Sequence, residues 1–600
     1  MKKFLKYVFA TFLGSFLGIT AIVIIIVSVI AGSVSVVTDI TNKHVSVQDS
    51  SFLVLNLNKR ITEKTHINPF EDILPSQKAS TIGLTDMCRS ITAAEKDESI
   101  IGIIIQPGIM QAEYTSIFEI RKALKKFKKS GKPIYAYADS YSQKSYLLSS
   151  IADTICIHPQ AMFELKGISS QTLFFKDLLQ KIGIEPILIR TGKYKSAAES
   201  LVLDSLSTEN RKQIHAYISN IWGHINETIR SSRPHITHDL SYYANNLTIW
   251  NAETARKHNF VDSVMYFDSF ISFIKKHYTD SHIKDIPQIP LVQYMTHISQ
   301  QKNLPAVVKK NTKQKIAVVL AEGTIDMGKG DDTSIGEKSY AHIIRSLRKD
   351  TTIQAIVLRI NSGGGSALAS DIIWHEVHLA AQEKPLIVSM GTYAASGGYY
   401  IATPAHTIVA EHSTLTGSIG VFGMLVRADQ TIDKLGISFD TVKTHNFSDF
   451  GSPFRSISPR EYTVLTNGID DIYTTFKNRV AQGRNLSDEF VDSIAQGRIW
   501  SGTDALRLGL VDTLGTISDA IEIAAHNAEI RDDYTIEIFP KKPDMFKELS
   551  QSFFDSEEHV FSFVQQIFGE ESGTMLNTIS KSIPQKEGIY VQYPYVLRIE

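Results

Sequence analysis

An internal repeat constrains this sequence more than any other feature. Two stretches separated by about 252 residues carry similar patterns, and a period of this kind indicates that one structural unit occurs twice. The apolar run SIIGIIIQ (99–106) corresponds to TIQAIVLR (352–359), and ADTICIHPQA (152–161) corresponds to AHTIVAEHST (405–414). The 600 residues also exceed what one hydrophobic core usually organises, so we expect two related domains.

Each copy alternates short apolar runs with helical patterns. The stretch 115–141 carries apolar residues at Ile117, Ile120, Leu124 and Phe127, a spacing typical of an amphipathic helix. Buried strands that alternate with such helices form parallel sheets through crossover connections, and their ligands bind at the strand ends. We therefore predict an α/β fold in which each copy runs strand, helix, strand, helix, strand.

The repeat pattern and a polar, lysine-rich stretch between the copies divide the chain. The tail has an amphipathic helical pattern, which is typical of a surface helix or an assembly element. The predicted parts are an anchor and stalk at 1–45, a first repeat at 46–298, a linker at 299–315, a second repeat at 316–545 and a tail at 546–600.

The N-terminus predicts a single transmembrane helix. Residues 7–38 contain no charged side chain, and ITAIVIIIVSVI (19–30) is nearly all apolar, so the segment exceeds the roughly 20 residues that span a bilayer. A cleaved signal peptide is the alternative, because small residues stand at 31–33. The length of the apolar run favours an uncleaved anchor in the cell membrane over a signal peptide or a core helix.

Charges on either side of this segment predict its orientation. Lys2, Lys3 and Lys6 precede it, and the first charge after it is Asp39. The positive-inside rule then leaves the N-terminus in the cytoplasm and residues 40–600 outside.

Charge and cysteine content give no reason to expect nucleic acid, a disulfide framework or a cysteine-bound metal. The net charge of −1 gives no electrostatic reason to expect nucleic acid. Cys88 and Cys156 allow at most one disulfide and match no metal spacing, so the fold depends on its core. We expect no metal or cofactor in the reaction.

The second copy carries two chemical features that the first lacks. Ser396 lies in GTYAASGGYYIATPA (391–405), where the first copy has Lys144, and NSGGGS (361–366) stands where the first has PGIMQA (107–112). A serine that opens a helix and a glycine-rich turn at a strand end can form a nucleophile and an oxyanion hole. Taken alone, the serine also fits a helix N-cap, and the turn fits a flexible loop or an anion nest.

The first copy carries a lysine that the second lacks. Lys195 lies in GKYKSAAES (192–200), and its counterpart in the second copy is Ser448. If the copies pack as a pair, Lys195 can reach Ser396 and take its proton, provided that burial lowers its pKa from about 10.4 towards 7–8. A solvated surface lysine is the alternative, and a base among the nineteen histidines stays open. The sequence AASGG lacks the leading glycine of G-x-S-x-G, which argues against an α/β-hydrolase elbow.

Four motifs stand out along the two copies. They are GKYKSAAE (192–199), RINSGGGSALAS (359–370), SMGTYAASGGYYIATPA (389–405) and STLTGSIGVFG (413–423). Together they resemble the signal peptide peptidase A (protease IV) family in its long two-repeat bacterial form. The likeness extends over roughly residues 1–545, and the motifs stand in the family's order.

The resemblance implies a fold, a location and a set of roles. The family is similar to the crotonase and Clp-protease group, forms a membrane-anchored homotetramer outside the cytoplasmic membrane and cleaves remnant signal peptides. Ser396 is then the nucleophile, Lys195 the general base and Ser418 the hydroxyl that orients the lysine. Gly364 and Gly397 would donate backbone N–H groups to the oxyanion.

Two positions depart from the family's pattern. Gly363 stands where the family usually has a proline, and Ser200 stands where a proline commonly follows the glutamate. Neither change removes a reacting group, although glycine gives the oxyanion turn more backbone freedom.

These observations predict a Ser-Lys serine endopeptidase, anchored in the bacterial inner membrane with its catalytic part outside the cytoplasm. Its expected substrates are cleaved signal peptides and other short hydrophobic peptides. Two alternatives stay open: a crotonase-type acyl-CoA enzyme, whose fold also uses glycine-rich turns, and a catalytically inactive membrane scaffold.

Overall fold

A computed structural model places most of both repeats. The predicted anchor at 7–38 and most of the predicted linker and tail lie outside the described residues. Among the residues that are described, no helix combines the length and apolar character needed to cross a membrane. The described residues are 46–65, 81–278, 285–300, 314–331, 333–530, 534–541 and 589–592.

The first repeat is built on a six-stranded parallel sheet with the order β8-β6-β5-β4-β1-β9. Its strands are β1 (Ser51–Asn56), β4 (Ile100–Gln106), β5 (Ile134–Ala138), β6 (Thr154–Ile157), β8 (Ser263–Val264) and β9 (Gln288–Pro290), with β2 (Arg60–Thr62) and β3 (Thr81–Gly83) paired separately. Its helices are α2 (Leu84–Lys96), α3 (Tyr114–Lys128), α4 (Gln143–Ser149), α5 (Lys176–Ile182), α6 (Glu199–Val202), α7 (Thr208–Ser232), α8 (Leu240–Asn245), α9 (Ala252–Lys257), α10 (Phe267–Tyr278) and α11 (Leu291–Gln300).

The second repeat is built on an eight-stranded sheet that is parallel except where β17 meets β19. Its strands are β10 (Lys315–Glu322), β13 (Ile353–Ser362), β15 (Leu386–Ala395), β16 (Thr407–Ala410), β17 (Leu415–Gly417), β19 (Ile499–Ser501), β20 (Thr513–Leu514) and β21 (Thr535–Phe539). Its helices are α12 (Glu337–Lys349), α13 (Ala367–Glu383), α14 (Gly397–Ala402), α15 (Asp429–Lys434), α16 (Pro459–Arg484), α17 (Asp488–Ile494), α18 (Gly502–Arg507) and α19 (Ile517–Asn527).

Helix α3 shows how the sequence pattern produces this architecture. The predicted apolar set, Ile117, Ile120, Leu124 and Phe127, is fully buried on one face of the helix. Apolar strands such as β4 are covered by helices of this kind, which is why they carry long runs of β-branched residues. The predicted α/β fold is therefore observed in both halves of the chain.

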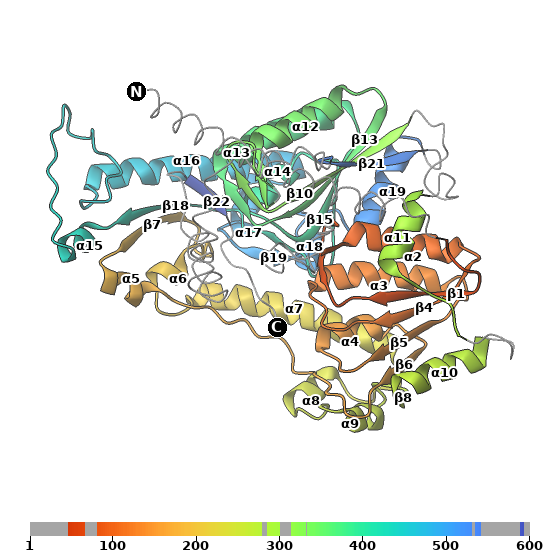
Figure 1. The fold of residues 1–600 in the computed structure, drawn as a ribbon. Helices are drawn as coiled ribbons and strands as arrows, with labels where there is room; N and C mark the ends of the chain where they lie inside the picture. The colour runs from red at the N-terminus through yellow and green to blue at the C-terminus, as the bar shows by residue number, and fades with distance from the viewer. Residues whose placement is uncertain are drawn as a thin grey trace, which may run out of the picture.

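A third sheet joins the two repeats. Its order is β12-β11-β14-β22-β18-β7, formed by β7 (Glu185–Thr191), β11 (Thr324–Asp326), β12 (Ser334–Gly336), β14 (Gly364–Ser366), β18 (Val421–Arg427) and β22 (Ile589–Gln592). Strand β7 of the first repeat pairs antiparallel with β18 of the second over seven residue pairs, and the two form an arm beside α15 (Figure 1). The copies diverge here, because the residues equivalent to β7 in the second copy, near 437–443, form no strand.

The two repeats also share a core. The hydrophobic cluster beneath the first sheet includes Ala395, Leu415 and Ile499 from the second repeat. Ala395 is the last residue of β15, so this shared packing lies directly beside Ser396. Apolar burial thus fixes the relative position of the repeats close to that residue.

A buried ion cluster crosses the same interface. Arg359 at the end of β13 is 1% exposed, and it donates hydrogen bonds to Glu119 (2.6 Å) and to both oxygens of Glu63 (3.0 and 3.1 Å). Its remaining donors reach the Ser389 hydroxyl and the Met390 carbonyl oxygen. Burial, together with the Glu63 carboxylate, raises the pKa of Glu119 to about 7, although Arg359 opposes the shift.

Removing the cation from this cluster is expected to destabilise the fold strongly. Arg359→Met leaves two buried carboxylates without their compensating positive charge, which typically costs about 3–5 kcal/mol. Arg507 is the control, because its ion pair with Asp504 lies on the surface and Arg507→Met should cost less than about 1 kcal/mol. Chemical denaturation of both variants measures the difference, and equal losses would show that the buried cluster is not structurally important.

Candidate active site

Ser396 occupies a sharp turn between strand and helix. It lies between the end of β15 and the start of α14, is fully buried, and adopts φ 56° and ψ −118°. A non-glycine residue with positive φ is strained, and such strain is common at functional sites. The N–H group of Ser396 is held by the Gly417 carbonyl oxygen at 2.8 Å. Ser396 is the N-cap residue of α14 by position, but its hydroxyl makes no capping hydrogen bond to the helix.

The equivalent turn of the first repeat is an ordinary helix start. Ser142 caps α4 by accepting a hydrogen bond from the Ser145 N–H group. Lys144, which aligns with Ser396 in sequence, lies over the Tyr114 ring with 5.1 Å between its Nζ and the ring centroid. The difference between the copies therefore extends to the backbone geometry of the turn.

The amine of Lys195 reaches Ser396 across the repeat interface. Its Nζ lies 2.7 Å from Ser396 Oγ, 3.1 Å from Ser418 Oγ and 3.2 Å from the Ser418 carbonyl oxygen. Lys195 is 1% exposed, so the surface-lysine interpretation is wrong. Among the described residues, the hydrogen bonds of the Ser396 hydroxyl include this lysine and no imidazole. The structure thus brings Ser396, Lys195 and Ser418 together.

Burial determines the protonation of this lysine. Desolvation lowers the pKa of Lys195 well below its usual value, because the charged ammonium loses its hydration. Its three polar neighbours are neutral groups, two hydroxyls and a carbonyl oxygen. A neutral amine can accept a proton, so the site meets a condition for general-base chemistry.

One loop positions both reacting groups. Ser418 lies between β17 and β18 with φ 51°, and its N–H donates to the Arg498 carbonyl oxygen at 2.7 Å. The preceding residue, Gly417, accepts the hydrogen bond from the Ser396 N–H group. The loop therefore connects the nucleophile turn to the lysine partner through two consecutive residues.

The two glycines of the expected oxyanion hole lie at neighbouring strand ends. Gly397 is the first residue of α14, directly after Ser396. Gly364 has φ 98°, a conformation that favours glycine, and its N–H donates to the Ser362 hydroxyl at 3.1 Å. Ser362 pairs with Ala394 of β15, which places the glycine-rich turn beside the Ser396 turn.

Sequence reasoning missed two glycines that line the lysine side chain. A Cβ on Gly497, which has φ 74°, would lie 2.5 Å from the Cβ of Lys195. A Cβ on Gly420 would lie 3.3 Å from the Cδ of the same lysine. Both belong to the second repeat, so the second repeat leaves space for a side chain that the first repeat supplies. Gly420 lies in the motif STLTGSIGVFG (413–423), beside Ser418, whereas no motif in the sequence connects Gly497 to Lys195.

Gln213 on α7 was also missed. Its amide nitrogen donates to the Tyr194 carbonyl oxygen at 3.1 Å and to Ser196 Oγ at 3.3 Å. Its amide oxygen accepts from the Ile499 N–H group at 3.1 Å. A single buried side chain thus holds both neighbours of Lys195 and ties them to β19.

Comparison with known proteins identifies the family. The sequence matches peptidase family S49 twice, over residues 126–279 and 378–531, and the two matches are offset by 378 − 126 = 252 residues. The chain belongs to peptidase family S49. Protease 4 of Salmonella typhi is 34% identical over 465 residues, which cover 76% of this chain and 74% of that protein.

Other relatives match over similar lengths. Protease 4 of Haemophilus influenzae is 31% identical and covers 87% of this chain and 85% of that protein. The chloroplastic serine protease SPPA of Arabidopsis thaliana is 31% identical and covers 76% of this chain and 68% of that protein. A solved ClpP1 structure from Listeria monocytogenes matches 34% of this chain at 15% identity with a TM-score of 0.23.

These matches confirm a serine peptidase with the S49 unit present twice. They do not support the acyl-CoA enzyme or the inactive scaffold. The finer likeness to the crotonase and Clp-protease fold, the domain boundaries and the roles of the site residues stay predictions.

The strained turn gives a stability prediction. Ser396→Gly and Ser396→Ala both remove the hydroxyl, but only alanine keeps a Cβ at positive φ. We expect the glycine variant to be more stable than the alanine variant by about 1 kcal/mol. Thermal unfolding of the two proteins measures this difference, and an alanine variant that is equally stable would show that the turn is not strained.

Proposed function

We propose that Ser396 is the nucleophile and Lys195 the general base of a Ser-Lys endopeptidase that acts through an acyl-enzyme. The observation that carries this proposal is the 2.7 Å distance between the Lys195 amine and the Ser396 hydroxyl, both of them buried. A serine hydroxyl becomes a strong nucleophile only when a positioned base takes its proton. Burial lowers the pKa of Lys195 and so favours its neutral form, which is the form that can accept the proton.

The reaction follows from the positions of these groups. Neutral Lys195 accepts the Ser396 proton while the hydroxyl oxygen attacks a peptide carbonyl, and the resulting lysine ammonium protonates the leaving amine. Water then hydrolyses the ester with the same lysine as base. The Ser418 hydroxyl directs the lysine amine towards Ser396.

Backbone donors stabilise the oxyanion in this scheme. The N–H groups of Gly364 and Gly397 lie at adjacent strand ends and supply the positive potential that a tetrahedral intermediate needs. The Gly364 N–H currently donates to Ser362 Oγ, an interaction that the substrate oxygen would replace.

The dyad is tested by substitution combined with a pH profile. Ser396→Ala and Lys195→Ala should each lower kcat/KM for a hydrophobic peptide by at least about 10³-fold. In the unsubstituted protein, kcat/KM should rise with pH through the pKa of Lys195, because only the neutral amine accepts a proton. The midpoint should lie well below 10.5, the ordinary value for lysine.

Lys193 provides the matched control, because it lies two residues from Lys195 and is exposed. Lys193→Ala should retain activity, and its kcat/KM should rise with pH as in the unsubstituted protein. Activity retained in Lys195→Ala would exclude the dyad. A rise of kcat/KM centred near the ordinary pKa of lysine would exclude it as well.

We also propose that peptide substrates bind as an added strand beside the oxyanion turn. Strand β22 supports this binding mode, since it lies antiparallel between β14 and β18 and pairs Gly365 with Val591. An extended peptide in the same slot gains backbone hydrogen bonds on both sides and runs past Gly364. This geometry suits cleaved signal peptides and other short hydrophobic peptides, which are extended and apolar.

Removal of β22 tests whether peptide substrates bind between β14 and β18. A chain that ends at residue 588 should show a lower KM for a hydrophobic peptide and an unchanged kcat, because a tethered strand competes at high effective concentration. A chain that ends at residue 592 keeps β22 and serves as the control. A KM that is equal in the two truncated chains would mean that peptides bind elsewhere.

Membrane anchoring through residues 7–38 and a location outside the cytoplasm remain part of the proposal. The uncharged N-terminal segment and the lysines before it support them. Protease accessibility of the catalytic part in intact spheroplasts tests the orientation, and protection from added protease would contradict it.

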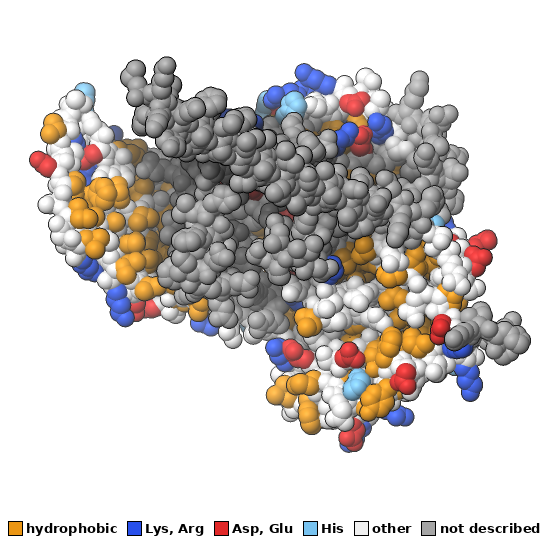
Figure 2. All heavy atoms as spheres, in the orientation of Figure 1, with side chains coloured by type: hydrophobic (Ala, Val, Ile, Leu, Met, Phe, Trp, Pro, Cys, Tyr) orange, Lys and Arg blue, Asp and Glu red, His pale blue; other side chains and the backbone are white. Residues whose placement is uncertain are grey.

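Assembly into a homotetramer is proposed from an exposed apolar surface. Figure 2 shows hydrophobic side chains gathered on the arm formed by β7, β18 and α15. Exposed apolar patches of this kind typically mark protein interfaces. Sedimentation of a Leu435→Glu, Val442→Glu variant tests this, and an unchanged mass would place the interface elsewhere. The exposed side chains beside these elements include Leu178 and Ile182 of α5, and Leu435, Ile437, Phe439 and Val442 in the segment directly after α15.

A further inference from the structure

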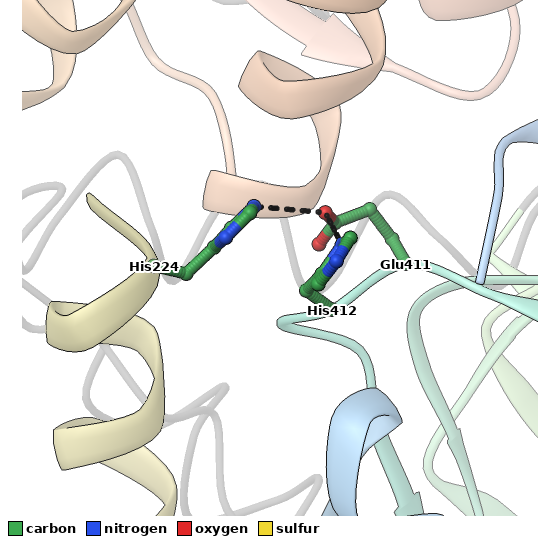
Figure 3. A group of neighbouring side chains, drawn as sticks. All are labelled: His224, Glu411 and His412. Atoms are coloured by element: carbon green, nitrogen blue, oxygen red, sulfur yellow. Dashed lines mark hydrogen bonds and ion pairs between the residues drawn. The ribbon is translucent and has the colours of Figure 1, made fainter. Parts of the chain in front are cut away.

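Two histidines and a glutamate meet where α7 of the first repeat faces the segment after β16 of the second. Figure 3 shows the His224 ring extending from its helix towards Glu411 and His412, which are adjacent in the chain. One ligand atom from each residue lies within 4.8 Å of the others. The dyad and its neighbours make no use of this cluster.

The glutamate is buried and its carboxylate is oriented. Glu411 is 4% exposed, and one of its oxygens accepts hydrogen bonds from the N–H and hydroxyl groups of Ser413. The other oxygen, Oε1, lies 3.6 Å from His224 Nε2 and 3.2 Å from His412 Nδ1. Within the described residues, the ion-pair partners of this carboxylate are these two imidazoles.

The glutamate offers a negative ligand atom between the two rings. A buried carboxylate is costly unless a positive group compensates it. The two imidazoles are stacked, with ring centroids 4.2 Å apart and planes 10° from parallel. A divalent ion bound by all three side chains would compensate the carboxylate.

We propose that His224, Glu411 and His412 bind a divalent transition-metal ion of the zinc class. Two imidazoles and one carboxylate are a ligand set that zinc uses in proteins, with a fourth position for water. Bond lengths of about 2.0–2.1 Å in a tetrahedron separate neighbouring ligand atoms by about 3.3 Å. The two nitrogen-to-oxygen distances, 3.2 and 3.6 Å, lie on either side of that value.

The third edge of the tetrahedron joins the two imidazole nitrogens, which lie within 4.8 Å of each other. Because the stacked rings direct their nitrogens along nearly parallel planes, binding one ion requires a ring to rotate. The side chain of His412 is 42% exposed, which leaves it free to turn its nitrogen towards the ion. The His224 ring packs against the Phe118 ring, with 4.2 Å between the two ring centroids. Calcium and magnesium are disfavoured, because they prefer sets composed of oxygen ligands.

The ion has a structural role that follows from its position. Helix α7 also carries Gln213, which holds the neighbours of Lys195, and Tyr217, whose hydroxyl donates to the Ser413 carbonyl oxygen at 2.8 Å. The segment after Glu411 leads through β17 to Ser418. A metal at this point fastens the first repeat to the segment that positions the dyad, without contacting the reacting atoms.

Metal binding is tested on the full chain in detergent after chelation and dialysis. Isothermal titration with Zn²⁺ should give one saturable site per chain, and Zn²⁺ but not Mg²⁺ should raise the unfolding temperature. Co²⁺ should give the intense visible absorption of a four-coordinate site. His412→Ala and Glu411→Gln should each weaken Zn²⁺ binding at least about tenfold.

His215 on the same helix is the matched control, since it is exposed and outside the cluster. His215→Ala should bind zinc as the unsubstituted chain does, and circular dichroism verifies that each variant is folded. His412→Ala is well suited to the test because its side chain is partly exposed. The proposal is overturned if saturable binding is absent, or if it persists unchanged in His412→Ala and Glu411→Gln, which would indicate adventitious surface binding only.

Discussion

The contact between the Lys195 amine and the Ser396 hydroxyl depends on the two repeats being packed together. Each group alone is unremarkable chemically, because lysine is normally protonated and a serine hydroxyl is a weak nucleophile. Enclosing both in the interface removes water from the amine, which lowers its pKa, and places the amine 2.7 Å from the hydroxyl. A small displacement of one repeat would break this geometry.

Several independent interactions hold the repeats in the required position. Strands β7 and β18 pair across the interface, Arg359 binds two carboxylates of the first repeat, and the first core includes Ala395. Gln213 holds the backbone carbonyl of Tyr194 and the hydroxyl of Ser196, on either side of the lysine. The duplicated unit therefore contains this serine–lysine contact once, because Ser396 belongs to one copy and Lys195 to the other.

The sequence predicted the elements that follow from local patterns. Helix α3 was predicted from its apolar spacing, and the repeat offset agrees with the two family matches. Ser396 and Lys195 were singled out because the copies differ at these positions, and the structure brings them together. Comparison of the copies was informative because a duplicated fold supplies its own structural reference.

Features that depend on long-range packing could not be read from the sequence. Nothing near Gly497 or Gln213 indicates that they contact the lysine segment, since such contacts arise only when the repeats dock. The strained Ser396 turn lacks the G-x-S-x-G pattern that usually marks such a turn. The strand β22 and the cluster around Glu411 likewise combine residues that are far apart in the chain.

The protonation state of Lys195 in the resting protein is the central claim. Its Cε resonance can be followed by NMR in a chain with ¹³C-labelled lysine, and a Lys195→Met variant identifies the signal. The account predicts that this resonance titrates well below 10.5, the ordinary value for lysine, and separately from those of the surface lysines. A Lys195 signal that titrates together with the surface lysines would contradict it.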